Sequence, residues 1–174
     1  MTARFVLEPL TVAHSNEMVD VLAPTDLYAF TGGEAPSLED LRALYGRQSI
    51  GHSAANDAGW LNWIIRSKDT RGAIGYMQAT VTREAGGLSA DLAWLITPAA
   101  QGTGAATEAS RAVCDWLRSW NVNRIRALVH PDHEASARVA QRIGLKWTSE
   151  LVDGEVVWQA IHTAPPPPVS GPTP

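Results

Sequence analysis

The stretch 94–120 constrains the fold more than any other part of this 174-residue chain. It begins with a tryptophan, a leucine and an isoleucine at 94–96, which is typical of the end of a buried strand. Pro98 ends that strand because proline has no N–H to donate to a neighbour. Small residues fill Gln101–Thr107, and from Ala105 apolar residues recur every three or four positions. This spacing predicts a strand, a short loop and an amphipathic helix in succession.

The inward face of the predicted helix follows from its period. It is expected to carry Ala105, Ala109, Ala112, Val113, Trp116, Leu117 and Trp120. Cys114 is predicted to lie away from that face, beside Ser110 and Arg118. It is the only cysteine, so the chain has no internal disulfide and no cysteine-based zinc site. We expect a spectator thiol there and not a nucleophile.

The loop before this helix has the composition of an anion site. The first backbone N–H groups of a helix have no internal partner, and the helix dipole places about +0.5 charge at that end. Gly102, Gly104, Ala105 and Ala106 have little or no side chain to keep a diphosphate from these N–H groups. The alternative is a tight strand-to-helix turn that uses glycine for its backbone angles and binds nothing.

The order of residues carries a family resemblance. Gln101-x-x-Gly104-x-Ala106 resembles the Q/R-x-x-G-x-G/A acetyl-CoA signature of the GNAT N-acetyltransferases. The run HPDHEASARVAQRIGL at 130–145 resembles the next motif of that superfamily, at the expected distance. The segments GYMQATVT and DGEVVW are most similar to the RimJ/RimL-like branch. Members of that branch acetylate protein N-termini or small amines, and a homodimer would be compatible with it.

Composition limits the classes of protein that fit. With 45% apolar residues, the chain can build one domain over 1–163, and the Pro-rich tail 164–174 should be extended and solvated. No run approaches the roughly 20 apolar residues of a membrane span, and the first residues lack the apolar core of a signal peptide. We therefore expect a cytoplasmic protein with no membrane partner. The net charge of −4, without a Lys/Arg cluster, argues against a nucleic-acid partner.

The element order matches the GNAT fold. The patterns predict strands at Phe5–Glu8, Trp60–Arg66, Ala73–Thr82, Leu88–Ile96, Arg124–Val129, Leu145–Val152 and Glu155–His162, and helices from Thr11 to about Leu22, from Ser37 to about Tyr45, from Ala105 to Trp120 and from Glu134 to Arg142. The resemblance implies an α/β (α+β) class, with a mixed, mostly antiparallel sheet of about seven strands. Its central parallel pair is expected to be splayed, and about four helices pack on the sheet.

The resemblance also assigns binding residues for acetyl-CoA, the acyl donor. The pantetheine arm is expected in the gap between the central strands, and the residues expected to bind the cofactor are Trp94, Leu95, Ile96, Gln101, Gly102, Thr103, Gly104, Ala105, Ala106, Thr107, His133 and Ser136. Main-chain N–H groups near Leu95 and Ile96 would stabilise the thioester oxyanion. His133 stands where most relatives carry an asparagine that contacts CoA.

Direct transfer to an amine requires an acid for the leaving thiolate. The resemblance places a tyrosine four residues before Gly144, but Ala140 is found there. Ser136, one turn earlier, is the nearest hydroxyl, and RimL-like members use a serine at this place beside a glutamate that resembles Glu150. Ser136 is therefore our candidate acid or sulfur-binding residue. The alternative is a hydroxyl that bonds only within its own helix turn.

The amine proton needs an acceptor. Glu150 and Asp91 are the main candidates, and Glu84 is a weaker one; each is alternatively a solvated strand carboxylate. A site without a dedicated base also stays open. In the resemblance the first two helices wall the acceptor pocket, which is expected to take a small-molecule amine or a peptide N-terminus. Tyr28 and Phe30 would lie near it, as would Tyr45.

Two other functions compete with transfer. A dinucleotide-binding module is suggested by Gly102-x-Gly104 before a helix, but Thr107 occupies the place of the third glycine and no acidic residue follows in time to meet a ribose. A catalytically silent acyl-CoA sensor or partner domain is favoured by the missing tyrosine and asparagine. We expect no metal at His130 and His133, because no further ligand pattern accompanies them.

Overall fold

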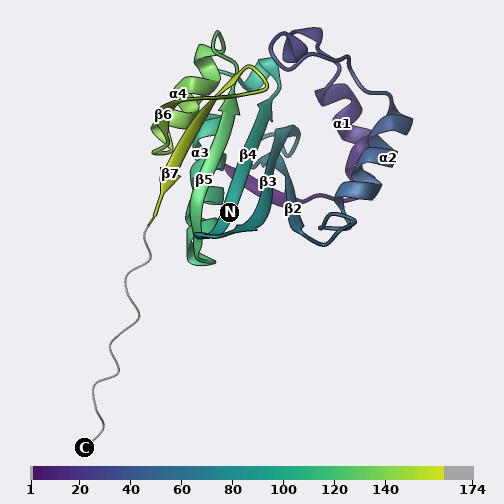
Figure 1. Cartoon of the computed structure of the whole chain (residues 1–174). Helices are drawn as coiled ribbons and strands as arrows, with labels where there is room; N and C mark the ends of the chain where they lie inside the picture. The colour runs from purple at the N-terminus through teal and green to yellow at the C-terminus, as the bar shows by residue number, and fades with distance from the viewer. Residues whose placement is uncertain (1, 163–174) are drawn as a thin grey trace, which may run out of the picture.

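The computed structural model describes residues 2–162, which form one seven-stranded sheet in the order β1-β2-β3-β4-β5-β7-β6 (Figure 1). The strands are β1 (Phe5–Pro9), β2 (Ala58–Ser67), β3 (Ala73–Glu84), β4 (Gly87–Ile96), β5 (Val122–Val129), β6 (Lys146–Val152) and β7 (Glu155–Ile161). The helices are α1 (Ser15–Val21), α2 (Leu38–Gln48), α3 (Ala105–Ser119) and α4 (Glu134–Arg142), with short 3₁₀ turns at Val12–His14, Thr25–Tyr28 and Pro98–Ala100. The predicted class, strand number and helix number are confirmed. The predicted tail 164–174 lies outside the described residues.

The centre of the sheet is splayed, as predicted. β4 and β5 are parallel neighbours, and their pairing runs from Leu88 with Val122 to Leu92 with Ala127. Beyond that point β4 stays paired with β3 as far as Ile96, and β5 stays paired with β7 as far as Val129. The two strand ends therefore diverge, and the last residues of β4 have no partner on the β5 side.

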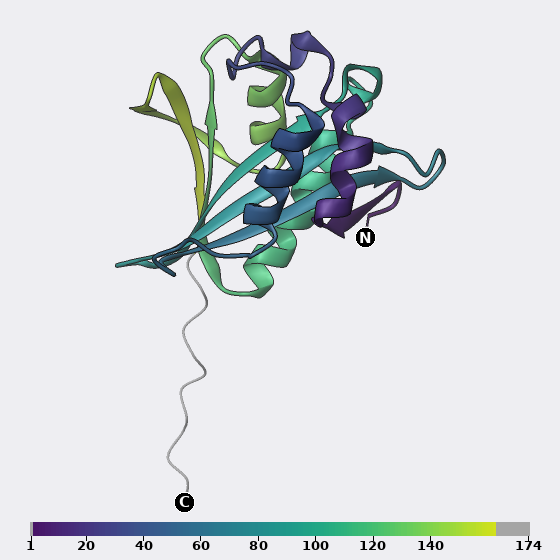
Figure 2. The same cartoon turned by 90° about the vertical axis from the view of Figure 1, so that its right-hand side faces the viewer.

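The helices cover the two faces of the sheet separately. In Figure 2, α1 and α2 (purple and blue) lie in front of the sheet, and α3 lies behind it. A small core under α1 and α2 contains Met18, Leu22, Leu41, Tyr45 and Ile64. The main core lies between α3 and the strands, where α3 contributes Ala105, Ala109, Val113, Cys114 and Leu117. None of the helices described is long and apolar enough to span a membrane.

The predicted inward face of α3 was partly wrong. Trp116 and Trp120 are 42% and 64% exposed, whereas Cys114 and Ser110 are fully buried. Because these small side chains let the helix approach the sheet closely, the contact face is rotated toward them. The tryptophans lie at its margin, where Trp116 packs edge-on against Trp63 at 5.8 Å. Burial raises the pKa of the Cys114 thiol to about 11, so the thiol stays protonated at neutral pH.

The start of the chain also differs from prediction in one detail. Thr11 precedes a 3₁₀ turn, and the α-helix proper begins at Ser15. Val12, which lies in that turn, is 42% exposed, while Ser15 and Met18 are buried. The helix α2 begins with a capping box, in which the Asp40 backbone N–H donates to Ser37 Oγ at 3.1 Å.

Candidate functional site

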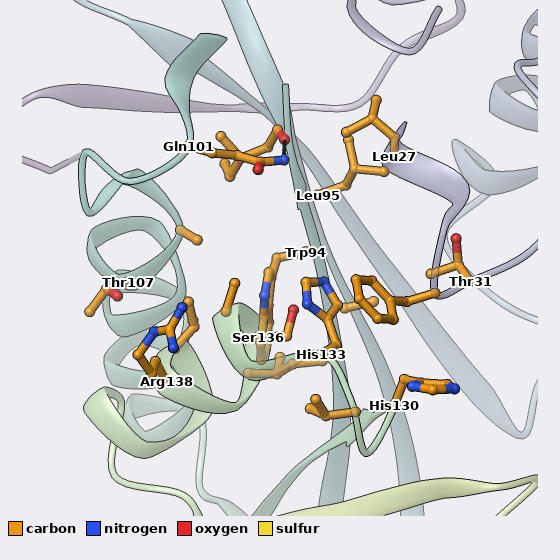
Figure 3. Close-up of a pocket in the computed structure, with 18 of the residues that line it drawn as sticks. Leu27, Thr31, Trp94, Leu95, Gln101, Thr107, His130, His133, Ser136 and Arg138 are labelled. Carbon is orange, nitrogen blue, oxygen red and sulfur yellow. Dashed lines mark hydrogen bonds between the residues drawn. The ribbon is translucent and has the colours of Figure 1, made fainter. Parts of the chain in front are cut away.

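A cavity of about 660 Å³ lies at the splay, between the ends of β4 and β5, the start of α3 and one face of α4. Figure 3 shows side chains from these elements and from the loop after Thr25–Tyr28 surrounding the open space. Of the residues expected to bind the cofactor, the cavity brings together Trp94, Leu95, Ile96, Gln101, Gly102, Gly104, Ala105, Ala106, Thr107, His133 and Ser136. Thr103 does not line it. Its hydroxyl donates to the Ala100 carbonyl at 2.7 Å.

The glycine loop is shaped by backbone angles that favour glycine. Gly102 has φ +74° and Gly104 has φ +83°, both in the left-handed region, and Gly104 is the N-cap of α3. Gln101 folds back, and its Nε2 donates to the Ile96 carbonyl at 2.9 Å (Figure 3). The loop therefore presents backbone and Cβ atoms to the cavity at the positive end of a 15-residue helix.

Arg4 fastens this loop to the start of β1. Its Nη1 donates to the Thr103 carbonyl at 3.0 Å, and its Nε donates to Glu108 Oε2 at 2.7 Å. Burial by itself would raise the pKa of Glu108, but hydrogen bonds, among them those from Arg4, outweigh it and leave that pKa lowered. The carboxylate is therefore ionised and holds the guanidinium beside the loop.

One face of α4 lines the opposite wall. Ala135, Arg138, Val139 and Arg142 follow the spacing of a helix face, and all four line the cavity together with Ser136. Our sequence reasoning missed the two arginines, although their four-residue spacing was the signal that would have placed them on one face. They give this wall positive charge, which suits an anionic ligand.

Ser136 opens into the cavity, whereas Ala140 does not. Ala140 is fully buried in the main core. Within the described part of the chain, the Ser136 hydroxyl makes no hydrogen bond, so the local helix bond considered as its alternative role is not formed. Figure 3 shows Ser136, Trp94 and His133 pointing into the same part of the cavity.

A segment near the start of the chain closes the far side of the cavity. Phe30 stacks on the ring of His133, with centroids 4.3 Å apart and planes 13° from parallel. Burial, and then the neighbouring His130, lower the pKa of His133, so its imidazole is neutral at pH 7. Asp26, Leu27 and Thr31 of the same segment also line the cavity. No sequence pattern predicted a helix or strand in this segment, and none indicated that it reaches α4.

The three candidate carboxylates lie in different surroundings. Asp91 lines the cavity, but its two oxygens accept from Arg126 Nε and Nη2 at 2.7 and 2.9 Å. This hydrogen bonding raises the pKa of Arg126. Glu150 is exposed on β6 and does not line the cavity, whereas Glu155, which sequence reasoning did not single out, does. Glu84 pairs with Arg124 at 3.2 Å.

A second, smaller cavity of about 250 Å³ lies between the sheet and the helices α1 and α2. Tyr28 and Tyr45 line it, together with Tyr76 from β3. Gln78 and Leu95 line both cavities, so the two spaces meet at these residues. Phe30 lines the larger cavity and not the smaller one.

The residues described contain no group of three or more histidine, cysteine or acidic side chains that could hold a metal ion. His130 and His133 both line the cavity, and both rings lie near Phe30, His130 at 5.5 Å between centroids.

Comparison with known proteins places this arrangement in a family. A family model described as "Acetyltransferase (GNAT) domain" matches residues 4–146, which is most of the chain. No curated protein sequence matches this chain. Similar solved structures include a GNAT-family acetyltransferase from Bacillus anthracis, with a TM-score of 0.75 and 14% identity over 92% of this chain and 96% of that one.

Two further structures contain ligands. One is the RimL ribosomal L7/L12 alpha-N-protein acetyltransferase in complex with coenzyme A, with a TM-score of 0.75 and 14% identity over 92% of this chain and 96% of that one. The other is the microcin C7 self-immunity acetyltransferase MccE in complex with acetyl-CoA and AMP, with a TM-score of 0.74 and 14% identity over 91% and 93%. At these identities the likeness establishes the fold.

Proposed function

Because this chain belongs to the GNAT acetyltransferase family, we propose that it is an acetyl-CoA-dependent N-acetyltransferase of the RimJ/RimL-like branch. It moves the acetyl group directly to a primary amine, either a protein N-terminus or a small amine, while both substrates are bound. The observation that carries the proposal is the splay after Leu92 and Ala127, which opens onto the same cavity as the glycine loop of α3.

The residues present fit acetyl-CoA along the whole cavity. The diphosphate would bind the backbone N–H groups of the loop at Gly102–Ala106, supported by Arg138 and Arg142. The pantetheine arm would pair with the main chain of β4 at 93–96, where that strand has no partner on its β5 side. Arg4 would keep the loop in its binding geometry through the Thr103 carbonyl.

The transfer forms one bond and breaks one. The lone pair of the neutral amine attacks the thioester carbonyl carbon, a C–N bond forms, the C–S bond breaks, and the electron pair leaves on the sulfur. Main-chain N–H groups near Leu95 and Ile96 stabilise the oxyanion. Ser136, whose hydroxyl faces the cavity without a protein partner among residues 2–162, donates a hydrogen bond to the departing thiolate, which leaves as the CoA thiolate or takes its proton from water.

An alkyl amine is mostly protonated at pH 7 and then has no lone pair, so a proton must be removed from it before it can attack. Asp91 and Glu150 are the carboxylates considered for this role; the first is held by both nitrogens of Arg126 and the second lies outside the cavity lining. His133 is better suited, because its imidazole is neutral at pH 7 and lines the cavity beside Ser136. We therefore assign proton acceptance to His133, through water, with Asp91 and Glu150 as the variants to compare.

The acceptor would enter from the smaller cavity. That cavity meets the larger one at Gln78 and Leu95, which is the level of β4 where the thioester carbonyl is expected. A ternary complex then needs no protein nucleophile, and the only thiol, Cys114, is buried in the core. Holding two substrates at one junction can contribute roughly 7–11 kcal/mol to lowering the barrier.

A silent acyl-CoA-binding domain is the second candidate, favoured by Ala140 at the position where the resemblance leads one to expect a tyrosine. Release of CoA thiol from acetyl-CoA, measured over a panel of amines and N-terminal peptides, separates the two functions. Thiol release that requires an amine, with N-acetylated product by mass spectrometry, supports transfer. Acetyl-CoA binding in a thermal-shift assay without release from any amine supports the silent domain, and no binding at all rejects both.

The catalytic roles need their own variants. Ser136→Ala should lower kcat by about 10²–10³-fold and leave acetyl-CoA affinity within about twofold, because the hydroxyl acts on the leaving sulfur. Asp91→Asn and Glu150→Gln serve as comparisons, and His133→Gln should remove the acidic limb of the kcat/KM profile. If Glu150→Gln or Asp91→Asn abolishes that limb and His133→Gln keeps it, the assignment of the base is wrong.

A further inference from the structure

The smaller cavity contains a polar group with no partner. Tyr45 of α2 is only 4% exposed and lines this cavity, yet its hydroxyl makes no hydrogen bond to any residue in 2–162. Buried polar groups in proteins are nearly always hydrogen-bonded, and leaving one unsatisfied is costly. The neighbouring Tyr28, by contrast, donates to the Leu22 carbonyl at 2.8 Å. A ligand that reaches this hydroxyl from the cavity would supply its missing hydrogen-bond partner.

The rest of the cavity wall is almost free of charge. It is built mostly from aliphatic and aromatic side chains, and the neutral amides of Gln48, Asn62 and Gln78 supply further polar groups. Glu34 is its single charged residue, and that side chain is exposed. A ligand group that enters here therefore loses water without meeting an opposite charge, which favours an apolar group and penalises an ionised one.

Size restricts the occupant further. The cavity holds about 250 Å³, below the roughly 300–1,000 Å³ typical of pockets for drug-sized ligands. It suits one side-chain-sized group and not several sugar rings. Because Gln78 and Leu95 also line the larger cavity, an amine attached to that group would reach the junction at β4.

We propose that the acceptor is a primary amine carried by a single uncharged group of aromatic size, with a hydrogen-bond acceptor that faces the Tyr45 hydroxyl. This rests on the proposed function, and it narrows the acceptor from amines in general to one chemical class. The apolar body occupies the smaller cavity, the nitrogen lies at Gln78 and Leu95, and attack on the thioester proceeds as described above. Two sources share this chemistry: a free arylalkylamine and a peptide that begins with an aromatic residue.

Polycationic amines are disfavoured for the same reason. Spermidine and kanamycin each carry several ammonium groups, and only one of them is consumed by acetylation. Any second ammonium inside the smaller cavity would be desolvated without a carboxylate beyond the exposed Glu34. Selectivity among amines therefore depends on the near absence of charge along this wall and on the Tyr45 hydroxyl, which has no hydrogen-bond partner in the described chain.

The test compares four free amines with acetyl-CoA: tyramine, 2-phenylethylamine, spermidine and kanamycin. Two tetrapeptides, one beginning with Tyr and one with Ser, separate the two sources. We expect tyramine to exceed 2-phenylethylamine by about tenfold in kcat/KM, because its hydroxyl satisfies Tyr45, and both to exceed spermidine and kanamycin. In Tyr45→Phe the ratio of tyramine to 2-phenylethylamine should fall to about one.

Tyr28→Phe is the matched control, because its hydroxyl already has a backbone partner in the same cavity. This variant should keep the tenfold ratio, although it loses one hydrogen bond and some stability. A Tm for each variant and its affinity for acetyl-CoA show that both remain folded. Tyr45→Phe itself should fold well, because it removes a hydroxyl that makes no bond.

The outcomes separate this inference from the proposed function. Acetylation of spermidine or kanamycin in preference to the arylalkylamines overturns the inference and leaves N-acetyltransfer intact. An unchanged amine ratio in Tyr45→Phe also overturns it, because a water then satisfies the hydroxyl. No acetylation of any amine or peptide overturns both.

Discussion

The two cavities that meet at Gln78 and Leu95 are built from different parts of the chain. Its glycine loop and the end of β4 supply the larger one with a nearly continuous stretch, 91–107, in which the residues of the loop are mostly small. The smaller one is lined mainly by bulky side chains from α2, the segment before it, β2 and β3, and three of these are tyrosines. At the loop, the larger cavity depends mainly on backbone geometry, whereas the smaller cavity depends on how side chains pack.

This difference implies that the two sites tolerate change differently. A site made of backbone N–H groups accepts many side chains nearby but no added Cβ at its glycines. A site made of packed side chains depends on the volume of each one. Variants in one cavity should therefore leave the affinity for the ligand of the other cavity nearly unchanged. Four experiments test this separation, from the largest expected effect to the smallest.

The largest effect is expected from Leu41→Ala under α2. Leu41 is 1% exposed within the small core of Met18, Tyr45 and Ile64. Truncation should destabilise the protein by about 2–5 kcal/mol, because it leaves a cavity that the surroundings fill only in part. Urea unfolding measures this change. Leu44→Ala, on the same helix at 36% exposure, is the control and should cost less than about 1 kcal/mol.

The same variant tests the separation directly. The folded fraction of Leu41→Ala should bind acetyl-CoA with a Kd within about twofold of the wild type, while the KM for the amine rises. An equal loss of acetyl-CoA affinity would show that the two cavities form one energetic unit.

The next effect is expected from Gly104→Ala in the larger cavity. Gly104 has φ +83° and Gly154, in the turn between β6 and β7, has φ +85°, so the two are matched for backbone strain. Alanine at either position should cost roughly 1–2 kcal/mol of stability. Only at Gly104 should acetyl-CoA affinity also fall, by about 100-fold, because alanine disfavours the left-handed backbone that orients the loop N–H groups. Calorimetric titration with acetyl-CoA measures the affinity of both variants. Equal affinities would show that the loop does not bind acetyl-CoA.

A smaller effect is expected from Arg4→Ala. The guanidinium supports the loop from outside through the Thr103 carbonyl and Glu108, and its side chain is 47% exposed. Since exposed ion pairs are weak, acetyl-CoA affinity should fall by only about three- to fivefold, and less at high salt. Arg118→Ala, which removes the Asp115 pair at the other end of α3, should leave affinity unchanged. A loss as large as that of Gly104→Ala would mean that Arg4 contacts the ligand itself.

The smallest effect is expected from pH, at the contact between Phe30 and His133. Burial lowers the pKa of His133 below its ordinary value, so the folded protein takes up this proton less readily than the unfolded chain. The stability gained from the neutral ring is present above about pH 6.5 and is lost as pH falls through the lowered pKa. Between pH 7 and pH 5 the Tm of the wild type should drop by about 1–2 °C more than that of His133→Gln, a small value because the ring is partly solvated.

His52→Gln is the control for that experiment, since His52 is an exposed histidine remote from both cavities. Between pH 7 and pH 5 the Tm of His52→Gln should change by the same amount as that of the wild type. A His133→Gln curve parallel to the wild type would show that this ring does not resist protonation.

Local sequence signals predicted the elements and the glycine loop well. Sequence patterns located all seven strands to within a few residues, because each strand is flanked by turn residues and most are half buried. The loop was readable because glycines with positive φ and small residues at a helix start are local requirements. Nearly all residues expected at the loop and on β4 line the larger cavity, and Thr103 is the exception.

Predictions that depended on which side chains meet were less accurate. The predicted inward face of α3 wrongly included Trp116 and Trp120, which are exposed. Hydrophobicity alone does not reveal that small residues on another face allow the helix to approach the sheet more closely. Arg138 and Arg142 were overlooked, and the expected carboxylate Glu150 lies outside the cavity that Glu155 lines. The contact of Phe30 with His133 joins residues about a hundred positions apart, and no short-range pattern encodes it.

The sequence by itself determined what the backbone does locally: the strand that ends at Ile96, the glycine turn and the helix whose dipole faces it. These depend on neighbours within a few residues, through backbone angles and hydrogen bonding. Only the tertiary structure decided where β4 and β5 part, which histidine meets Phe30, and that the Tyr45 hydroxyl is buried without a partner. Those features arise from packing between distant segments, where the fit of volumes and not the order of residues selects the arrangement.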